Sequence, residues 1–357
     1  MIKKECFTAE WIEQVSSELH YNDKNLIEKV IRALSLLEML VKAGCPLVFK
    51  GGTALMLILG KSAHRLSIDI ALICPPGTNI EDYLKSFADF GFINLELVER
   101  KQRDDADIPK SHSKFFYQIA YRNDTDAQSY ILLDVLYEDI HYFRTQQIAI
   151  NCPFIRLEGK PLMVTVPSAE DILGDKLTAF APNTTGIPYY RNGRSCSMEI
   201  AKQLYDVGRL FENVSDLQIT KEAFRKIAVV ELSYRSFGTD IGQVFNDIRQ
   251  TALCISTRGK AGEGDFDLIQ DGIIRVKSFM YKQRYLIDHA IIDAARAAYL
   301  ATLIEKGINE IESYSNNPAD IKDMVIRPSL PNKLNKLRSN LPEAYYYWAK
   351  TSELLEA

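Results

Sequence analysis

Apolar residues follow two different spacings along the chain, and the change from one to the other falls near residue 165. Residues 23–43 carry apolar side chains at intervals of three and four, which predicts a helix that ends at Gly44. Short apolar or alternating runs, typical of strands, lie at 46–50, 67–74, 93–100, 113–122 and 129–137. From Ser168 onward nearly every periodic segment has the helical spacing. The pattern predicts an α/β (α+β) chain, with a mixed sheet and flanking helices over residues 1–165 and an all-helical domain over residues 166–357.

A glycine pair at the end of the first predicted strand is a candidate for phosphate binding. Lys50-Gly51-Gly52-Thr53 closes that strand and opens a short helix, so backbone N–H groups and the helix N-terminus can approach phosphate oxygens. Thr53 is suited either to capping the helix or to touching a phosphate. Most glycine pairs are plain turns, so the pair needs support from its neighbours.

An acidic segment follows this turn, in the order Arg65-Leu-Ser67-Ile-Asp69-Ile-Ala71. Alternate residues of a strand share a face, so Asp69 and residue 71 point the same way. Two carboxylates so placed can share a pair of Mg²⁺ ions that clamp the oxygens of a phosphoryl transfer. Asp69 has the simpler alternative of an ion pair with Arg65. The order of glycine pair, arginine, serine and aspartate favours the metal site.

Three further charged residues suit the same chemistry. Asp134 lies inside the apolar run 130–136, where an unpaired carboxylate is costly, so it is either a third metal-site carboxylate or half of a structural ion pair. Lys176 lies among apolar neighbours on a predicted helix and can reach triphosphate oxygens, unless it is an ordinary surface lysine. Asp206 follows Lys202 by four residues, which alone indicates a common helical ion pair.

Together these pieces resemble the AbiEii/AbiGii nucleotidyltransferase toxin family, the toxin half of type IV toxin–antitoxin systems. The family pattern has a Lys-Gly-Gly-Thr turn, an Arg-x-Ser-x-Asp-x-Asp strand, a later strand aspartate, an Asp-Lys-Leu helix and a Lys-Asp-x-x-Asp helix. The residues that match it are Lys50 to Thr53, Arg65, Ser67, Asp69, Asp134, Asp175 to Leu177, Lys202 and Asp206. The chain departs from the pattern at Ala71 and at Gln203. The resemblance is specific because the elements arrive in the family's order.

The resemblance implies a metal-dependent nucleotidyltransferase that uses Mg²⁺ or Mn²⁺ and a nucleoside triphosphate (NTP). It assigns metal binding to Asp69 and Asp134, and catalysis to these two residues together with Lys176 and Asp206. It assigns nucleotide binding to Lys50, Gly51, Gly52, Thr53, Arg65, Ser67 and Lys176. The implied acceptor is RNA, with the 3′ end of tRNA as the favoured target. A cognate antitoxin encoded nearby is the implied protein partner, in toxin–antitoxin or phage-defence (abortive infection) biology.

Ala71 stands where the family has its second aspartate, and it bears directly on activity. A methyl group cannot replace a carboxylate in the near-octahedral oxygen shell of Mg²⁺, so we expect a loss on the order of several kcal/mol of transition-state stabilisation. This predicts an inactive or nearly inactive polypeptide. A natural pseudoenzyme and a deliberate replacement that silences a toxic product both explain the alanine, and the intact motif around it favours replacement.

Composition sets the remaining limits. The 357 residues, 46% of them hydrophobic, are enough for two domains, and six scattered cysteines predict reduced thiols in a cytoplasmic protein. No apolar run predicts a membrane span. The net charge of −4 does not indicate a nucleic-acid binder. Local candidates for RNA contact are the basic segments 274–286 and 327–338, which could instead be solvated helix faces. A third candidate is the turn-rich loop 181–195, which could instead be a plain connection between helices.

Two other functions fit the same residues. A non-catalytic nucleotide- or RNA-binding pseudoenzyme would bind NTP without transferring it, even with an acid restored at residue 71. A small-molecule nucleotidyltransferase of the antibiotic-modifying type predicts an acidic pocket for a cationic acceptor, whereas an RNA-modifying enzyme predicts basic walls around the site.

Overall fold

The computed structural model describes residues 1–98, 109–121, 127–214, 216–235, 238 and 240–357. The chain forms two compact units, each described by itself below. The first contains Met1–Ser168 and Ser278–Arg284, and the second contains Ala169–Lys277 and Tyr285–Ala357. The segment Ser278–Arg284 therefore folds with the sheet although helices precede and follow it in the sequence. The sequence pattern did not indicate this exchange.

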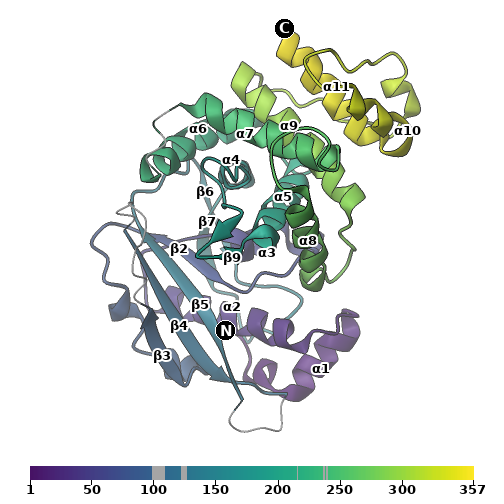
Figure 1. The fold of residues 1–357 in the computed structure, drawn as a ribbon. Helices are drawn as coiled ribbons and strands as arrows, with labels where there is room; N and C mark the ends of the chain where they lie inside the picture. Colours follow the sequence, from purple (N-terminus) through teal and green to yellow (C-terminus); the bar gives the residue numbers. More distant parts are fainter. Residues whose placement is uncertain (99–108, 122–126, 215, 236–237, 239) are drawn as a thin grey trace. The chain divides into compact units, whose positions relative to one another are not determined.

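A five-stranded mixed sheet in the order β1-β2-β5-β4-β3 forms the centre of the first unit (Figure 1). Its strands are β1 (Val48–Lys50), β2 (Ile70–Cys74), β3 (Asn94–Val98), β4 (Lys110–Gln118) and β5 (Gln128–Tyr137). Strands β2 and β5 are parallel, and the other neighbouring pairs are antiparallel. The sheet confirms the predicted fold class. Residues 99–100 and 122 of the predicted strands lie outside the described residues.

The alternation along β5 separates the two faces of the sheet. Ile131, Leu133 and Val135 are buried in the apolar core, to which helix α2 (Lys24–Lys42) also contributes. Residues between them in the sequence point to the opposite face, because successive side chains of a strand alternate. Asp134 therefore lies on the face away from this core, with 39% of its side chain exposed.

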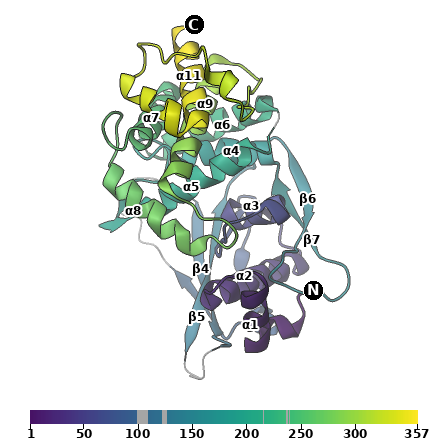
Figure 2. The same cartoon turned by 90° about the vertical axis from the view of Figure 1, so that its right-hand side faces the viewer.

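Two helices and a hairpin complete the first unit. Helix α1 (Ala9–Glu18) precedes α2, and helix α3 (Gly51–Leu59) starts directly at the glycine pair. The antiparallel hairpin of β6 (Thr145–Ala149) and β7 (Met163–Pro167) packs against β1 and α3, and the sequence pattern did not predict it. Figure 2 shows α2 and α3 beside the strands of this unit.

The second unit is helical, as predicted for the C-terminal region. Its helices are α4 (Ala169–Ala179), α5 (Ser197–Phe211), α6 (Leu217–Tyr234), α7 (Ile241–Ser256), α8 (Phe266–Val276), α9 (Ile287–Lys306), α10 (Leu337–Asn340) and α11 (Pro342–Glu356). Helix α9 packs against α5, α7 and α11. A small antiparallel hairpin, β8 (Tyr190–Arg191) and β9 (Arg194–Ser195), lies in the loop between α4 and α5. Within the described residues, no helix has the length and apolar character to cross a membrane.

Candidate active site

The glycine pair lies where neighbouring residues leave almost no room for a side chain. Gly51 has φ +82°, and a Cβ at this position would lie 3.3 Å from the Cβ of Ala71. A Cβ on Gly52 would lie 2.7 Å from Ser67 Oγ and 3.0 Å from Arg65 Nη2. The turn therefore packs directly on the Arg-x-Ser-x-Asp-x-Ala segment, and the two motifs form one local structure.

Thr53 joins the start of α3 to the acidic segment. Its side chain is fully buried, and its Oγ1 donates a hydrogen bond of 2.7 Å to the backbone carbonyl of Asp69. The hydroxyl is thus used inside the fold, although the sequence also suggested contact with a phosphate. The side chain of the N-cap residue, Lys50, forms no capping hydrogen bond with α3. The backbone N–H groups of its first turn are therefore the stronger candidates for phosphate contact.

A row of four paired residues crosses the sheet beside this turn. Lys50 pairs with Ala71, Ala71 pairs with Asp134, and Asp134 pairs with His112. Directly paired residues on neighbouring strands present their side chains on the same face. The methyl group of Ala71 therefore lies between a lysine and an aspartate, on the face away from the apolar core.

His112 is a member of this row that the sequence analysis did not single out. Its Nδ1 forms a hydrogen bond with Asp134 Oδ1. The side chain is only 8% exposed, and its Nε2 has no hydrogen-bond partner within the described residues. The sequence left open whether Asp134 has a structural partner, and the structure shows that the imidazole of His112 is one. Only the register of β4 against β5 identifies it, because nothing in the local sequence marks His112.

Lys29 on α2 is a second basic residue that the sequence analysis missed. Burial lowers the pKa of Lys29, and the carboxylates of Asp69 and Asp23 partly oppose this shift. Lys29 therefore lies within electrostatic reach of Asp69, which is exposed directly before β2. A single lysine in an amphipathic helix gives no sequence signal for such a position.

The carboxylates in this unit do not make a complete metal site. Asp69 and Asp134 are the proposed ligands, but Ala71 offers no donor between them. Throughout the described part of the chain, no group of three or more His, Cys, Asp or Glu side chains could hold a metal ion. The residues present therefore do not fit the Mg²⁺ or Mn²⁺ ions that the family motif implies.

The helical unit holds the other predicted catalytic residues in a buried ion pair. Lys176 on α4 donates from Nζ to Asp206 Oδ2 at 2.9 Å and to Gln203 Oε1 at 2.8 Å, both on α5. The side chains of Lys176 and Asp206 are 8% and 2% exposed. Gln203, one of the two departures from the family pattern, is thus itself a partner of Lys176. The surface-lysine alternative for Lys176 is wrong.

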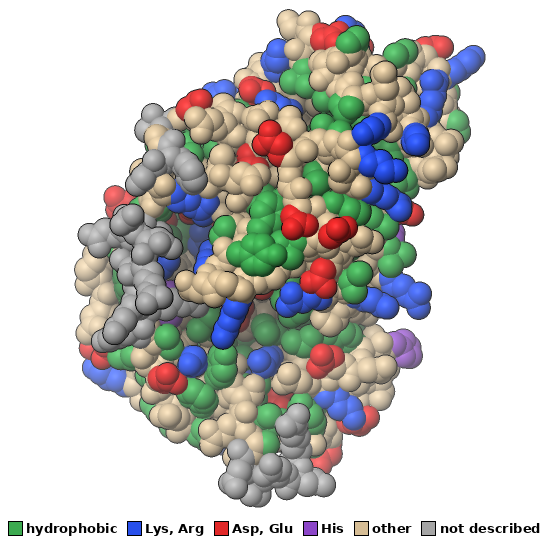
Figure 3. All heavy atoms as spheres, in the orientation of Figure 1, with side chains coloured by type: hydrophobic (Ala, Val, Ile, Leu, Met, Phe, Trp, Pro, Cys, Tyr) green, Lys and Arg blue, Asp and Glu red, His purple; other side chains and the backbone are tan. Residues whose placement is uncertain are grey.

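The basic segments 274–286 and 327–338 include side chains that are buried or already hydrogen-bonded, which does not suit base stacking or phosphate contact. Tyr281 and Tyr285 are buried, at 6% and 3% exposure, so their rings are not free to stack on RNA bases. In Figure 3, Lys and Arg side chains gather over the C-terminal helices. Within segment 327–338, Lys333 and Arg338 already donate hydrogen bonds to backbone carbonyls.

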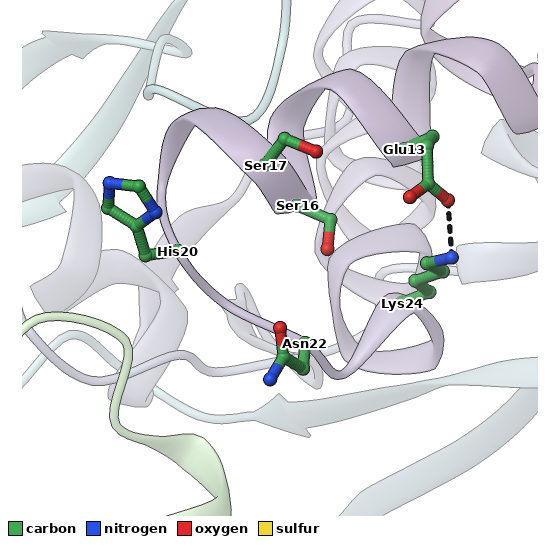
Figure 4. Close-up of a pocket in the computed structure, with 6 residues that line it drawn as sticks. All are labelled: Glu13, Ser16, Ser17, His20, Asn22 and Lys24. Carbon is green, nitrogen blue, oxygen red and sulfur yellow. Dashed lines mark ion pairs between the residues drawn. The ribbon is translucent and has the colours of Figure 1, made fainter.

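A polar hollow at the junction of α1 and α2 is distinct from these residues (Figure 4). It has a volume of about 550 Å³ and is lined by Glu13, Ser16, Ser17, His20, Asn22 and Lys24. Glu13 and Lys24 form an ion pair across it. The hollow contains none of the motif residues, so it is not the candidate active site.

A mixed sheet that carries a Gly-Gly turn against the segment Arg65–Ala71, with a helical C-terminal region, defines a protein of the nucleotidyltransferase class. Residues 34–319 match the family described as "Nucleotidyl transferase AbiEii toxin, Type IV TA system". The chain belongs to this family, which confirms the resemblance in its motifs.

The structure is similar to two solved structures at low sequence identity. JHP933 from Helicobacter pylori is 15% identical, with a TM-score of 0.39 over 86% of this chain and 95% of that chain. MenT4, the nucleotidyltransferase toxin Rv2826c from Mycobacterium tuberculosis H37Rv, is 14% identical, with a TM-score of 0.43 over 82% of this chain and 89% of that chain. No curated protein sequence matches the chain.

Proposed function

We propose that this chain is a toxin-type enzyme that transfers a nucleotide from an NTP to RNA, and that Ala71 holds the present form at little or no activity. The observation that supports this most strongly is the row Lys50–Ala71–Asp134, with Gly51 packed on Ala71. An aspartate at residue 71 would add a carboxylate directly beside Asp134 and two positions from Asp69. Lys50, Gly51 and Asp134, which lie beside that position, match the family's motif.

The residues of the first unit divide into phosphate-binding and acidic groups. The backbone of Gly51 and Gly52 and the N-terminus of α3 would bind phosphate oxygens. Lys50 and Arg65 would neutralise their charge, and Ser67 would fix the turn. Asp69 and Asp134 would be the carboxylates near the reacting phosphorus, where the acceptor hydroxyl forms a new P–O bond and pyrophosphate leaves.

Lys176 and Asp206 complete the proposed set from the helical unit. Asp206 orients the Lys176 ammonium through a hydrogen bond of 2.9 Å, and Lys176 would provide a point charge for the triphosphate. Divalent metal ions, when held by a complete carboxylate set, would supply charge neutralisation of the transferring group. We propose Mg²⁺ or Mn²⁺ for this role, a cytoplasmic location, and a cognate antitoxin as partner.

RNA is favoured over a small cationic acceptor by the charge around the turn. Lys29, Lys50 and Arg65 all lie near the motif residues in the first unit, beside the carboxylates of Asp69 and Asp134, and we propose that they make the walls around the turn basic. A cationic aminoglycoside-like acceptor would be repelled by such walls, whereas an RNA backbone would be attracted. The 3′ end of tRNA is the acceptor we propose to test first.

A non-catalytic nucleotide-binding module is the second candidate, because Ala71 leaves the turn intact while removing a ligand. The two functions are separated by comparing the parent chain with Ala71→Asp and with the uncharged, isosteric control Ala71→Asn. Each protein is incubated with Mg²⁺ or Mn²⁺, each labelled NTP, and total bacterial RNA. We expect label on a defined RNA with Ala71→Asp alone. Saturable NTP binding with no transfer by any variant would refute the enzyme and support the binding module.

A further inference from the structure

Segment Ser278–Arg284 pairs with the backbone that leads into the Arg65 motif. We propose that this segment is a positioning element of the nucleotide site, that it holds Arg65 against Gly52, and that Tyr281 is its principal positioning residue. The inference rests on the proposed function, since it assumes that the glycine turn binds NTP. All of the contacts that support the inference lie within the first unit.

Backbone hydrogen bonds join the segment to residues 64–66 through an isolated β-bridge. Arg65 and Met280 form an antiparallel bridge. On one side of the bridge, the Leu66 N–H donates to the Phe279 carbonyl at 2.8 Å, and on the other the Tyr281 N–H donates to the His64 carbonyl at 3.0 Å. Hydrogen bonds that flank a pair in this way are those of an antiparallel ladder. Arg65 is therefore fixed from both sides by residues that lie more than two hundred positions later in the sequence.

Side chains strengthen the same contact. The Tyr281 hydroxyl donates to the carbonyl of Ala63, and the Tyr281 ring packs edge-on against Phe154 with 5.3 Å between ring centroids. Lys282 Nζ donates to the carbonyl of Lys61 at 2.9 Å. At the other end, the Tyr21 hydroxyl donates to the carbonyl of Ser278. The segment thus donates hydrogen bonds to the carbonyl groups of Lys61, Ala63 and His64 in the connection between α3 and β2.

The orientation of Arg65 depends on this connection. The side chain is 7% exposed, its Nη1 donates to the Leu66 carbonyl at 3.0 Å, and its Nη2 lies 3.0 Å from the position of a Cβ on Gly52. A change in the backbone at residues 63–66 would therefore move the guanidinium away from the turn. Displacement of a positioning group by about 1 Å can lower the rate about 10²-fold.

The test compares Tyr281→Phe and Tyr281→Ala with the parent and with Tyr345→Phe. Tyr345 is a matched control, because its buried hydroxyl also donates to a backbone carbonyl, that of Met324 at 2.9 Å, but lies in the helical unit. Binding of ATP, GTP, CTP and UTP with Mg²⁺ is measured by calorimetry, and exchange of the Leu66 amide by hydrogen–deuterium exchange. In the Ala71→Asp background, KM and kcat for transfer are measured separately.

We expect Tyr281→Ala to weaken binding of the preferred NTP about ten-fold and to raise KM more than it lowers kcat, because Arg65 acts on bound triphosphate. Tyr281→Phe keeps the ring contact, so its NTP affinity should lie between those of Tyr281→Ala and the parent. This variant still tests the inference if Tyr281→Ala does not fold. Tyr345→Phe should bind NTP like the parent.

Two results would overturn the inference for different reasons. Unchanged NTP affinity in both Tyr281 variants, with faster exchange at Leu66, would show that the segment does not position the site, while leaving the proposed function intact. Absence of NTP binding by both the parent and Ala71→Asp would refute the nucleotide function, and this inference with it.

Discussion

His112 on β4 and Asp134 on β5 are directly paired across the sheet, and the imidazole Nδ1 is hydrogen-bonded to the Asp134 carboxylate. This contact explains how an aspartate is accommodated in the middle of an apolar strand. It also fixes the direction of the carboxylate beside Ala71, because one of its oxygens is already bonded. Partners of this kind orient carboxylates in many metal sites.

Removal of His112 should therefore weaken metal binding once the missing carboxylate is restored. In the Ala71→Asp background, we expect His112→Ala to lower Mn²⁺ affinity about 10–100-fold, measured by electron paramagnetic resonance titration. His112→Asn keeps an N–H donor near Asp134 and should retain most of the affinity. Equal affinity in all three proteins would show that the contact serves only the fold.

Gly52→Ala tests the contact between the turn and the acidic segment. The new Cβ would lie 2.7 Å from Ser67 Oγ, so Ser67 or the turn must move and NTP affinity should fall about ten-fold. In Gly52→Ala with Ser67→Ala, the nearest clash is removed and the melting temperature should recover more than NTP affinity. Calorimetry and thermal unfolding distinguish the two effects. Full recovery of NTP binding in the double variant would mean that Ser67 has no role beyond spacing.

Lys176→Met should destabilise the helical unit, because it leaves the Asp206 carboxylate buried without its ammonium partner. Breaking one side of a buried ion pair typically costs about 3–5 kcal/mol, which urea unfolding can measure. The double variant Lys176→Met with Asp206→Leu should recover most of this loss. Arg258→Met, in an exposed pair with Asp288, is the control and should change stability by less than about 1 kcal/mol.

The same double variant also tests the proposed catalytic role of Lys176. In the Ala71→Asp background, a refolded double variant should transfer little or no nucleotide. Near-normal transfer by this variant would restrict the Lys176–Asp206 pair to a structural role.

The β8–β9 hairpin is the surface we expect to contact acceptor RNA. Its turn residues Asn192 and Gly193 both have positive φ, and Tyr190 beside them is 58% exposed. Arg191 and Arg194 are exposed, and neither side chain forms an ion pair or hydrogen bond with the described part of the chain. Two guanidiniums and an aromatic ring on one hairpin suit phosphate contact and base stacking.

Replacing both arginines of this hairpin by alanine should weaken binding of labelled bacterial tRNA about ten-fold and reduce the salt dependence of binding, with NTP affinity unchanged. Fluorescence anisotropy at several salt concentrations measures both quantities. A variant with Lys306→Ala and Lys322→Ala removes the same charge elsewhere on the helical unit and should bind RNA normally. Equal losses in the two variants would mean that the hairpin makes no specific contribution.

Tyr281 should make stability depend on pH in the alkaline range. Burial raises the pKa of Tyr281 from 10.0 to about 12, because the neutral hydroxyl is the form that fits the site. Its contribution to the free energy of unfolding is therefore complete below pH 10 and is lost as the pH rises through 12, by up to about 3 kcal/mol. The stability difference between the parent and Tyr281→Phe, from denaturant unfolding, should shrink over this window. A constant difference would show that Tyr281 ionises without cost.

The local sequence was sufficient to predict helices and strands whose structure depends on their own residues. The spacing of apolar residues predicted α2, and Asp23 and Gly44 mark its two ends as an N-cap and a residue with positive φ. The apolar runs predicted β2 and β5, and the glycine pair predicted the start of α3. The β6–β7 hairpin was missed, because Thr145–Ala149 is mostly polar and neither strand shows clear alternation over its short length.

Features that depend on distant pairing had no local signal. The contact between His112 and Asp134 follows from strand register, which the sequence pattern did not give. Ser278–Arg284 lies between helices and is basic and aromatic, so its composition indicated a surface rather than a segment bridged to Arg65. The roles assigned to Asp69, Lys176 and Asp206 stay predictions until the variants above are measured.

The late position of Ser278–Arg284 in the chain has a consequence for biosynthesis. When Ser168 has left the ribosome, the first unit still lacks the segment that pairs with residues 64–66. At about 5–20 residues per second, that segment is translated on the order of ten seconds later. During that interval the nascent protein therefore lacks part of the proposed nucleotide site, whichever residue stands at position 71.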